Sequence, residues 1–221
     1  MISRQKLLLH SAAKSVVFAL CLLPFAWLFY RALANQLGAN PAEALIRSTG
    51  DWTLRFICIV LAVTPLRTIS NTPALARFRR MLGLFVYFYV VVHLLSYSWF
   101  DMNFDVSDIV KDIVKRPFIL VGFTAFLLLT PLAATSFNKA IKTMGVKRWQ
   151  MLHKLVYLIS GLGLLHFFWM RAGKNNFAEV FVYAGIVAIL LGWRVVQYVK
   201  KKKLQPAKKM AASLLKAQQI Y

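Results

Sequence analysis

The sequence is poor in acidic side chains. Its 221 residues include 7 aspartates and glutamates but 28 lysines and arginines, for a formal net charge of +21. It also lacks a glycine-rich nucleotide motif, a carboxylate pair for acid–base work and a nucleophilic triad. These absences predict that the chain performs no bond chemistry on a substrate by itself. A nucleic-acid binder can carry such a charge, but 59% of these residues are hydrophobic, which excludes that class.

Long apolar runs dominate what is present. Runs of this length, separated by short charged stretches, indicate helices that cross a bilayer, because a helix satisfies its own backbone hydrogen bonds in hydrocarbon. We therefore expect an all-α integral membrane protein, a six-transmembrane-helix bundle. The first run is expected to be an uncleaved helix, not a secretory signal peptide, since further spans follow it. The expected spans are 15–34, 52–66, 82–100, 118–134, 149–169 and 177–199.

The domain organisation is simple. Residues 1–203 are expected to form the transmembrane domain, and residues 204–221 a basic cytoplasmic tail that suits an amphipathic helix lying on the membrane. The loop 101–117 has room for a short interfacial helix. Both cysteines, Cys21 and Cys58, fall in apolar runs, so we interpret them as packed side chains and not as a disulfide.

Charge distribution predicts the orientation. All lysine- and arginine-rich clusters fall on the side of the two termini, which the positive-inside rule assigns to the cytoplasm. The opposite side receives every acidic residue: Glu43, Asp51, Asp101, Asp105, Asp108, Asp112 and Glu179. The high net charge is thus a topology signal together with attraction to anionic lipid.

Three histidines lie within the predicted spans. His93 belongs to the third span, and His153 and His166 belong to the fifth. Intramembrane ionisable residues usually mark a functional path, and imidazole is a common axial ligand of haem iron. At ~1.5 Å per helical residue, His93 lies ~12 Å from the outer charged edge, His166 ~7 Å and His153 ~27 Å. The matching depths predict that His93 and His166 are the axial ligands of one haem b.

The role of His153 stays open at this point. It is either an interfacial histidine bonded to a neighbouring helix, a contact for a quinone or flavin, or a ligand of a second, inner haem. Arg80 and Arg148 are expected at the same inner level. In a straight helix His153 and His166 point ~140° apart, so a shared cavity requires a kink. The residues suited to such a kink are Ser160, Gly161 and Gly163.

Four further residues are candidates for contact with the edges of a haem. Arg55, Lys115 and Arg116 lie near the outer end, where they are either partners of the haem propionates or ordinary snorkelling cations. Gly163, one turn before His166, either leaves room for a porphyrin or allows close helix packing.

Several motifs carry a family resemblance over residues 49 to about 170: TGDWTLRF, TPLR, RRMLGLFVYFYVVVHLLSY, KRPFILVGF, PLAATS and KRWQMLHKLVYLISGLGLLHFFW. They resemble the MsrQ family, the haem-binding subunits of protein-methionine-sulfoxide reductase systems, within the ferric-reductase-like transmembrane proteins. The resemblance implies a multi-pass protein of the bacterial inner membrane that binds haem b and FMN. It implies electrons from membrane quinol or a cytoplasmic flavin reductase, delivered to a periplasmic molybdopterin-containing methionine sulfoxide reductase subunit.

The resemblance also points to His93, His153 and His166 as functional residues. One departure concerns the related NADPH oxidases, which carry two histidines on the third span. Here Arg79 and Arg80 occupy the inner position, which argues against a second bis-histidine haem. The rival class is a metal-ion transporter or metalloreductase using the same histidines, but the spans lack interior carboxylates. A purely structural membrane protein is a third interpretation, which three histidines on two helices disfavour.

Overall fold

The structure is a computed structural model that describes residues 4–173 and 177–218, with side chains described for residues 5–173 and 177–204. Every regular element in these ranges is a helix. Six helices are long and apolar enough to cross a membrane, which confirms the predicted all-helical architecture with six spans. The elements in order are α1 (Arg4–Leu9), α2 (Ser11–Leu33), α3 (Pro41–Ile69), the 3₁₀-helix η1 (Pro73–Phe78), α4 (Arg79–Phe100), α5 (Val106–Lys115), α6 (Pro117–Ala134), α7 (Asn138–Met144), α8 (Val146–Leu152), α9 (Leu155–Ala172) and α10 (Ala178–Gln218).

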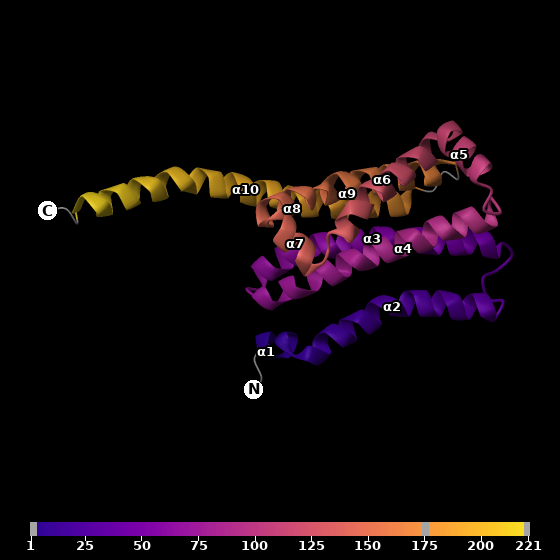
Figure 1. Cartoon of the computed structure of the whole chain (residues 1–221), viewed down its shortest axis with the longest axis horizontal. Helices are drawn as coiled ribbons and strands as arrows, with labels where there is room; N and C mark the ends of the chain where they lie inside the picture. The colour runs from indigo at the N-terminus through magenta and orange to yellow at the C-terminus, as the bar shows by residue number, and fades with distance from the viewer. Residues whose placement is uncertain (1–3, 174–176, 219–221) are drawn as a thin grey trace.

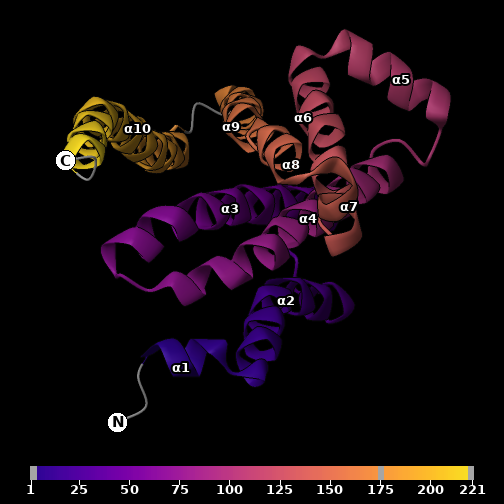
Figure 2. The ribbon, with the colours of Figure 1, turned by 60° about the vertical axis from the view of Figure 1, so that its left-hand side comes forward.

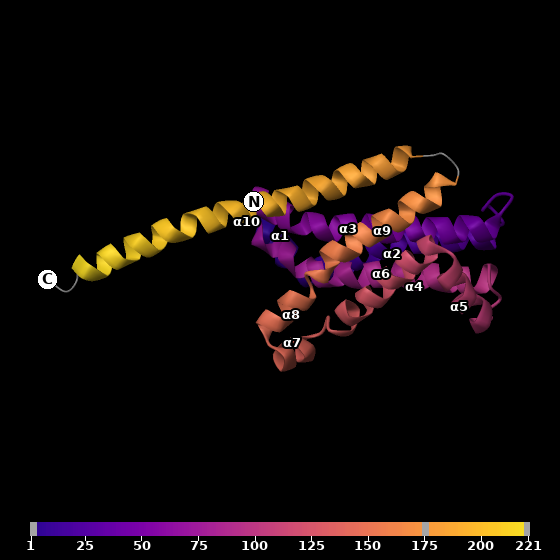
Figure 3. The ribbon, with the colours of Figure 1, turned by 90° about the horizontal axis from the view of Figure 1, so that it is seen from above.

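The long helices run side by side (Figures 1 and 3). α3 packs most extensively on α4, and α6 on α9, while α10 lies against both α3 and α9. One end of the bundle carries α5, which folds against α6 (Figure 2), and all seven acidic residues; we name it the acidic end. The other end carries α1, η1, α7 and α8, and we name it the basic end.

An aromatic core holds α3 to α4. Tyr89 on α4 is fully buried, and its ring stacks on Phe56 of α3 with 5.0 Å between ring centres. Its hydroxyl donates to the carbonyl oxygen of Cys21 and accepts from the backbone N–H of Phe25. The hydroxyl is thus inserted into the hydrogen-bond ladder of α2 beside Pro24, a usual place for a helix to bend. This core lies one helical turn from His93 and fixes the rotation of α4.

The fifth span departs from the expected single helix over 149–169. It is divided into α8 and α9, with His153 and Lys154 between them. Around the break, N–H groups bond three residues back: Lys154 donates to Met151 and Tyr157 donates to Lys154. This tightening is typical of a short 3₁₀ turn. The distortion therefore falls at His153. α9 continues through Ser160, Gly161 and Gly163, the residues suited to a kink, and His153 and His166 line different cavities.

α10 is the longest helix, and its backbone continues through the expected tail as far as Gln218. In Figure 3 it projects beyond the bundle at the basic end. The amphipathic character predicted for the tail depends on side chains that lie outside the described part, as do residues 219–221 entirely.

A half-buried arginine, Arg194, ties α10 to α3. Pro65 lacks an N–H, so the carbonyl oxygen of Leu61, four residues earlier, loses its usual helical donor. Arg194 of α10 supplies a replacement: its Nη2 donates to that oxygen at 2.6 Å. The guanidinium also lies over the ring of Tyr157, 5.4 Å from its centre. A charged side chain within a span is thus partnered by the carbonyl that a proline left unpaired.

We expect Arg194→Met to lower the unfolding free energy by about 1 kcal/mol, or a melting temperature by a few degrees, because Leu61 loses its donor. The measurement is thermal unfolding in detergent. In a Pro65→Ala background the new N–H at residue 65 can bond Leu61, so the same substitution should cost less. Equal losses in both backgrounds would show that the Leu61 contact contributes nothing.

Candidate cofactor site

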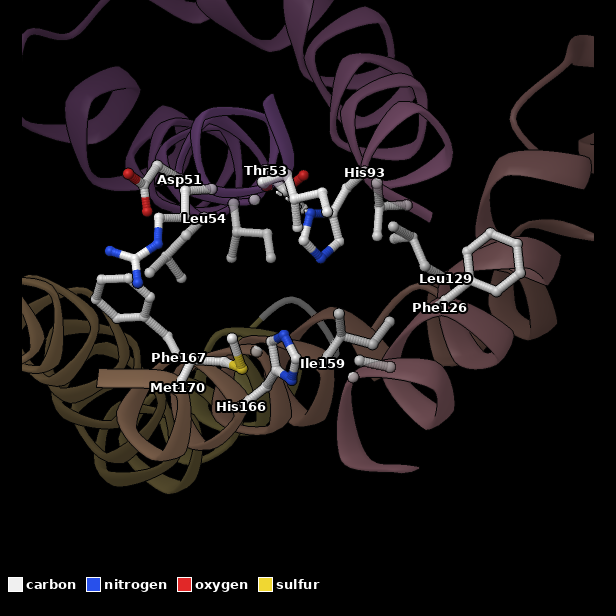
Figure 4. A pocket seen from close by; sticks show the side chains of 18 of the residues that line it. Asp51, Thr53, Leu54, His93, Phe126, Leu129, Ile159, His166, Phe167 and Met170 are labelled. Atoms are coloured by element: carbon white, nitrogen blue, oxygen red, sulfur yellow. Dashed lines mark hydrogen bonds between the residues drawn. The ribbon is translucent and has the colours of Figure 1, made fainter. Parts of the chain in front are cut away.

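Two histidines from different helices face each other near the acidic end. His93 lies on α4 and His166 on α9. Their ring centres are 6.2 Å apart and their planes are inclined by 79°. Figure 4 shows the two rings pointing at one another across a cavity. The structure therefore brings together the two residues whose depths in the sequence matched.

Each ring is held by a backbone carbonyl from a neighbouring helix. Nδ1 of His93 lies 2.8 Å from the carbonyl oxygen of Ile46, and Nδ1 of His166 lies 2.7 Å from that of Phe118. A carbonyl only accepts, so both Nδ1 atoms carry the proton and both Nε2 atoms keep a lone pair. Metal-bound histidines usually donate their other ring nitrogen in this way, which fixes tautomer and orientation.

Two glycines make room for the rings, and sequence reasoning missed both. A Cβ at Gly50 would lie 3.1 Å from Cε1 of His93, and a Cβ at Gly122 would lie 2.8 Å from Nδ1 of His166. Neither position tolerates a side chain without moving an imidazole. Gly163, the glycine that the sequence singled out, is less crowded: its Cβ would meet only Ile57, at 3.8 Å. Gly163 does line a cavity that reaches both histidines. This is the position expected of a glycine that leaves room for a porphyrin.

The histidine pair stands between two cavities. The first, which we name the α3 cavity, is bounded on one side by α3 from Ile46 to Ile57. The second, the α5 cavity, is bounded by α4, α5 and α6 and includes Tyr97 and Arg116. Both cavities reach His93 and His166. A flat group placed between the two imidazoles would therefore extend into both.

This arrangement fits a bis-histidine haem. A metal–imidazole bond is about 2 Å long and the nitrogen lies about 1 Å from its ring centre, so axial imidazoles have centres about 6 Å apart. The observed separation of 6.2 Å agrees with that value. Both donors are oriented by carbonyls, both are backed by glycine, and the surrounding walls are mostly apolar. The residues present thus suit a planar metal cofactor held by His93 and His166.

A third cavity lies toward the basic end and has a volume of about 310 Å³. Four side chains that carry or accept positive charge line it: Arg79, Arg80, His153 and Lys154. No carboxylate is among its lining residues. The structure thus brings Arg80 and His153 together, whereas Arg148 does not line this cavity. Arg79, which precedes Arg80 at the start of α4, lines the cavity instead.

His153 contacts two side chains at this basic-end cavity, Thr135 and Trp149. Its Nε2 lies 3.2 Å from the hydroxyl oxygen of Thr135. Its ring packs on Trp149, with 4.1 Å between ring centres. All four histidines of the chain lie in the described part, and no other histidine faces His153. The arrangement matches a hydrogen-bonded interfacial histidine that also presents a ring to a cavity.

The basic-end cavity and the α3 cavity share part of their lining. Three side chains line both: Ile57 of α3, Leu129 of α6 and Ile159 of α9. Leu129 and Ile159 are buried, with 6% and 2% of their surfaces exposed. The two cavities are therefore adjacent compartments divided by aliphatic side chains.

The other sequence candidates lie at the acidic end. Arg55 lines neither cavity that reaches the histidines; its Nε donates to the hydroxyl of Tyr183 at 3.0 Å, and its guanidinium covers Trp52. Lys115 ends α5. Arg116 lines the α5 cavity and pairs with Asp112 at 2.7 Å.

Two arginines of the α3 cavity were missed by sequence reasoning. Arg47 and Arg171 both line it. Arg171 lies near two carboxylates, those of Asp51 and Glu179. Within the described residues, no group of three histidine, cysteine or carboxylate side chains is arranged to hold a metal ion, so a protein-only metal site gains no support.

Comparison with known proteins agrees with this geometry. Residues 49–164 match the family described as "Ferric reductase like transmembrane component". The chain is 79% identical over 203 residues to a protein of Polaromonas naphthalenivorans, covering 92% of this chain and 93% of the relative. It is 55% identical to a protein of Herminiimonas arsenicoxydans (82% and 84% covered) and 50% identical to one of Ralstonia nicotianae (83% and 85%). All three relatives are named "Protein-methionine-sulfoxide reductase heme-binding subunit MsrQ". No solved structure matches the chain.

Proposed function

The chain belongs to the ferric reductase like transmembrane components and, among them, to the MsrQ haem-binding subunits; from this premise we propose its electron path. It takes electrons from membrane quinol or a cytoplasmic flavin reductase at the basic end. It passes them to a periplasmic, molybdopterin-containing methionine sulfoxide reductase subunit at the acidic end. The basic end is cytoplasmic and the membrane is the bacterial inner membrane, as the positive-inside rule favours.

The observation that carries the proposal is the facing pair His93 and His166. Their ring centres are 6.2 Å apart, a separation that suits a haem b iron, and their Nδ1 atoms donate to carbonyls, which leaves the Nε2 lone pairs for a metal. When bound, haem supplies a one-electron carrier within a span that otherwise insulates. The chain itself holds both imidazoles in one tautomer and surrounds them with mostly apolar side chains, and ligand orientation and burial are the protein's means of setting a redox potential.

The basic-end cavity is our proposed place of electron entry. Its positive lining suits the phosphate of an FMN, and its Trp149–His153 ring pair suits the face of a flavin or quinone ring. Ile57, Leu129 and Ile159, which line both cavities, would then lie between the donor and the haem. A metal-ion transporter is the less favoured function, because no group of three histidine, cysteine or carboxylate side chains among the described residues is arranged to hold a metal ion.

The absorption spectrum of the purified protein tests this function, since two axial imidazoles give a low-spin, six-coordinate haem. We expect Gly122→Ala to lose most of the haem or turn it high-spin, because the new Cβ would displace the His166 ring. Gly161→Ala is the matched control: it lies on α9 with no atom within 4 Å of its added Cβ. Haem per protein and the Soret spectrum are the measurements. Unchanged spectra in Gly122→Ala would argue against this ring as a ligand.

Docking of the periplasmic subunit is proposed at the loop and helix 101–116. Of the four acids there, Asp112 is unsuited to contact a partner: it is buried and accepts from Tyr97 at 2.6 Å and from Arg116. Asp101 lines the α5 cavity, and burial raises its pKa while Arg116 opposes that rise. Asp101, Asp105 and Asp108 are all exposed; since Asp101 borders the cavity, Asp105 and Asp108 are the proposed contacts for the partner.

We expect Asp105→Asn with Asp108→Asn to slow electron transfer to the partner several-fold at low salt and little at high salt, since exposed charges steer encounter. Asparagine preserves the N-cap that Asp105 gives to α5, so the helix should persist. Stopped-flow oxidation of the reduced protein by its partner measures this. Lys111→Gln should act in the opposite direction. Equal rates at low salt in all three proteins would remove this surface from the docking site.

A further inference from the structure

The haem site proposed above leaves open which way the cofactor lies. A porphyrin between His93 and His166 would reach into both the α3 and α5 cavities. Haem b carries its two propionates on one edge, so one cavity must receive two carboxylates and the other the apolar edge. Buried carboxylates require cationic or hydrogen-bonding partners.

The two cavities differ in the charges available to propionates. The α3 cavity presents two guanidinium groups, Arg47 and Arg171, and one carboxylate, Asp51. The α5 cavity presents one guanidinium, Arg116, and one carboxylate, Asp101. Arg116 is in addition bound to the buried Asp112 at 2.7 Å. Arg47 is likewise bound to Glu43 at 2.6 Å and Arg171 to Glu179, so each of these guanidinium groups has a carboxylate partner. The α3 cavity differs from the α5 cavity in offering two guanidinium groups where the other offers one, and therefore twice as many N–H donors for two carboxylates.

Arg171 is well placed to serve an anionic group. Only 15% of its side chain is exposed, and its guanidinium lies 5.1 Å from the ring centre of Phe167. Its contact with Asp51 is long, at 3.8 Å, so the pair is not a tight fork. A guanidinium has five N–H donors, so it can bind a further carboxylate while it keeps Glu179.

We propose that Arg47 and Arg171 form the propionate-binding site, with the haem's apolar edge in the α5 cavity. The other walls of the α5 cavity suit that edge, being lined by Leu94, Ile119 and Phe123. Asp51 acts as a positioning residue that shares Arg171 with the propionates. The inference rests on the proposed haem site but is separable from it, because either orientation keeps both axial ligands.

Titration of the cofactor-free, full-length protein in detergent with two probes tests the inference. The probes are iron protoporphyrin IX and its dimethyl ester, in which both propionates are neutral. We expect the wild type to prefer the free acid. Arg47→Gln with Arg171→Gln should weaken binding of the free acid by about tenfold or more per arginine. The same variant should bind the ester as the wild type does, with a low-spin spectrum, which shows that it is folded.

Arg116→Gln is the matched control, since it removes a guanidinium from the other cavity. It should leave the preference for the free acid unchanged. Loss of the preference in Arg116→Gln, with its retention in the double variant, would place the propionates in the α5 cavity and overturn the proposal. A wild type that binds both probes equally would overturn it as well. If the wild type binds neither probe with low-spin spectra, the haem function itself fails together with the inference.

Discussion

Replacing either His93 or His166 with alanine is expected to abolish the low-spin haem spectrum and to remove most of the bound haem. Each imidazole would supply one of two axial bonds, and both rings are already oriented for that role by backbone carbonyls. With one ligand gone, the remaining haem should become high-spin and five-coordinate. Haem content per protein and the visible spectrum measure both effects, and electron transfer should fall by orders of magnitude.

Added imidazole provides a sharp complement to these variants. Alanine leaves a ring-sized space at either position, so millimolar imidazole should restore part of the low-spin spectrum. His10→Asn is the control for a histidine outside the cavities: His10 caps α2, and asparagine can cap in its place. If His93→Ala and His166→Ala both keep a wild-type spectrum, the pairing is wrong and the proposed electron path has no centre.

The sequence predicted the depth of residues better than their direction. Counting residues from the charged edges suggested that His93 and His166 share a level, since depth along a helix grows by a fixed rise. The same counting gave Arg80, His153 and Arg148 one level. It says nothing of rotation about the helix axis, and rotation is what turns Arg148 away from the basic-end cavity and brings Arg79 to it.

Contacts between distant helices were beyond the sequence for a similar reason. Ile46 and Phe118 serve through their carbonyl oxygens, which every residue possesses, so no side-chain pattern could reveal them. Gly50 and Gly122 look like ordinary small residues of membrane helices until a ring from another helix is found against each. The break of the fifth span at His153 also leaves no signal in the sequence, because neither glycine nor proline lies beside it.

The prediction with the second-largest effect concerns electron entry. We expect His153→Ala to keep the low-spin haem spectrum but to be reduced about tenfold more slowly by a quinol analogue or flavin donor. Its ring lines the basic-end cavity and hydrogen-bonds Thr135, and no other histidine faces it within the described chain. Loss of the imidazole would remove a polar contact and one wall of a stacking surface without touching the axial pair.

Arg80→Ala should behave similarly, since Arg80 lines the same cavity and is oriented by Asn138, whose Oδ1 accepts from Nη1 at 2.7 Å. Arg80→Lys should restore only part of the rate if a bidentate contact matters, because lysine cannot supply the planar fork. Arg148→Ala is the control that distinguishes a role in the cavity from a general effect of positive charge at the basic end. It removes the same charge at the same end of the bundle but outside the cavity lining, so its rate should stay near that of the wild type.

The competing idea, that His153 ligates a second iron, makes a different forecast. In that case His153→Ala loses haem or converts part of it to high spin, and the reduction rate falls only as the haem content falls. Stopped-flow reduction and haem per protein, measured on the same preparations, distinguish the two. The basic-end cavity shares Ile57, Leu129 and Ile159 with the α3 cavity, so a donor bound there would lie in the compartment next to the haem site. Wild-type reduction rates in both His153→Ala and Arg80→Ala would therefore remove this cavity from the electron path.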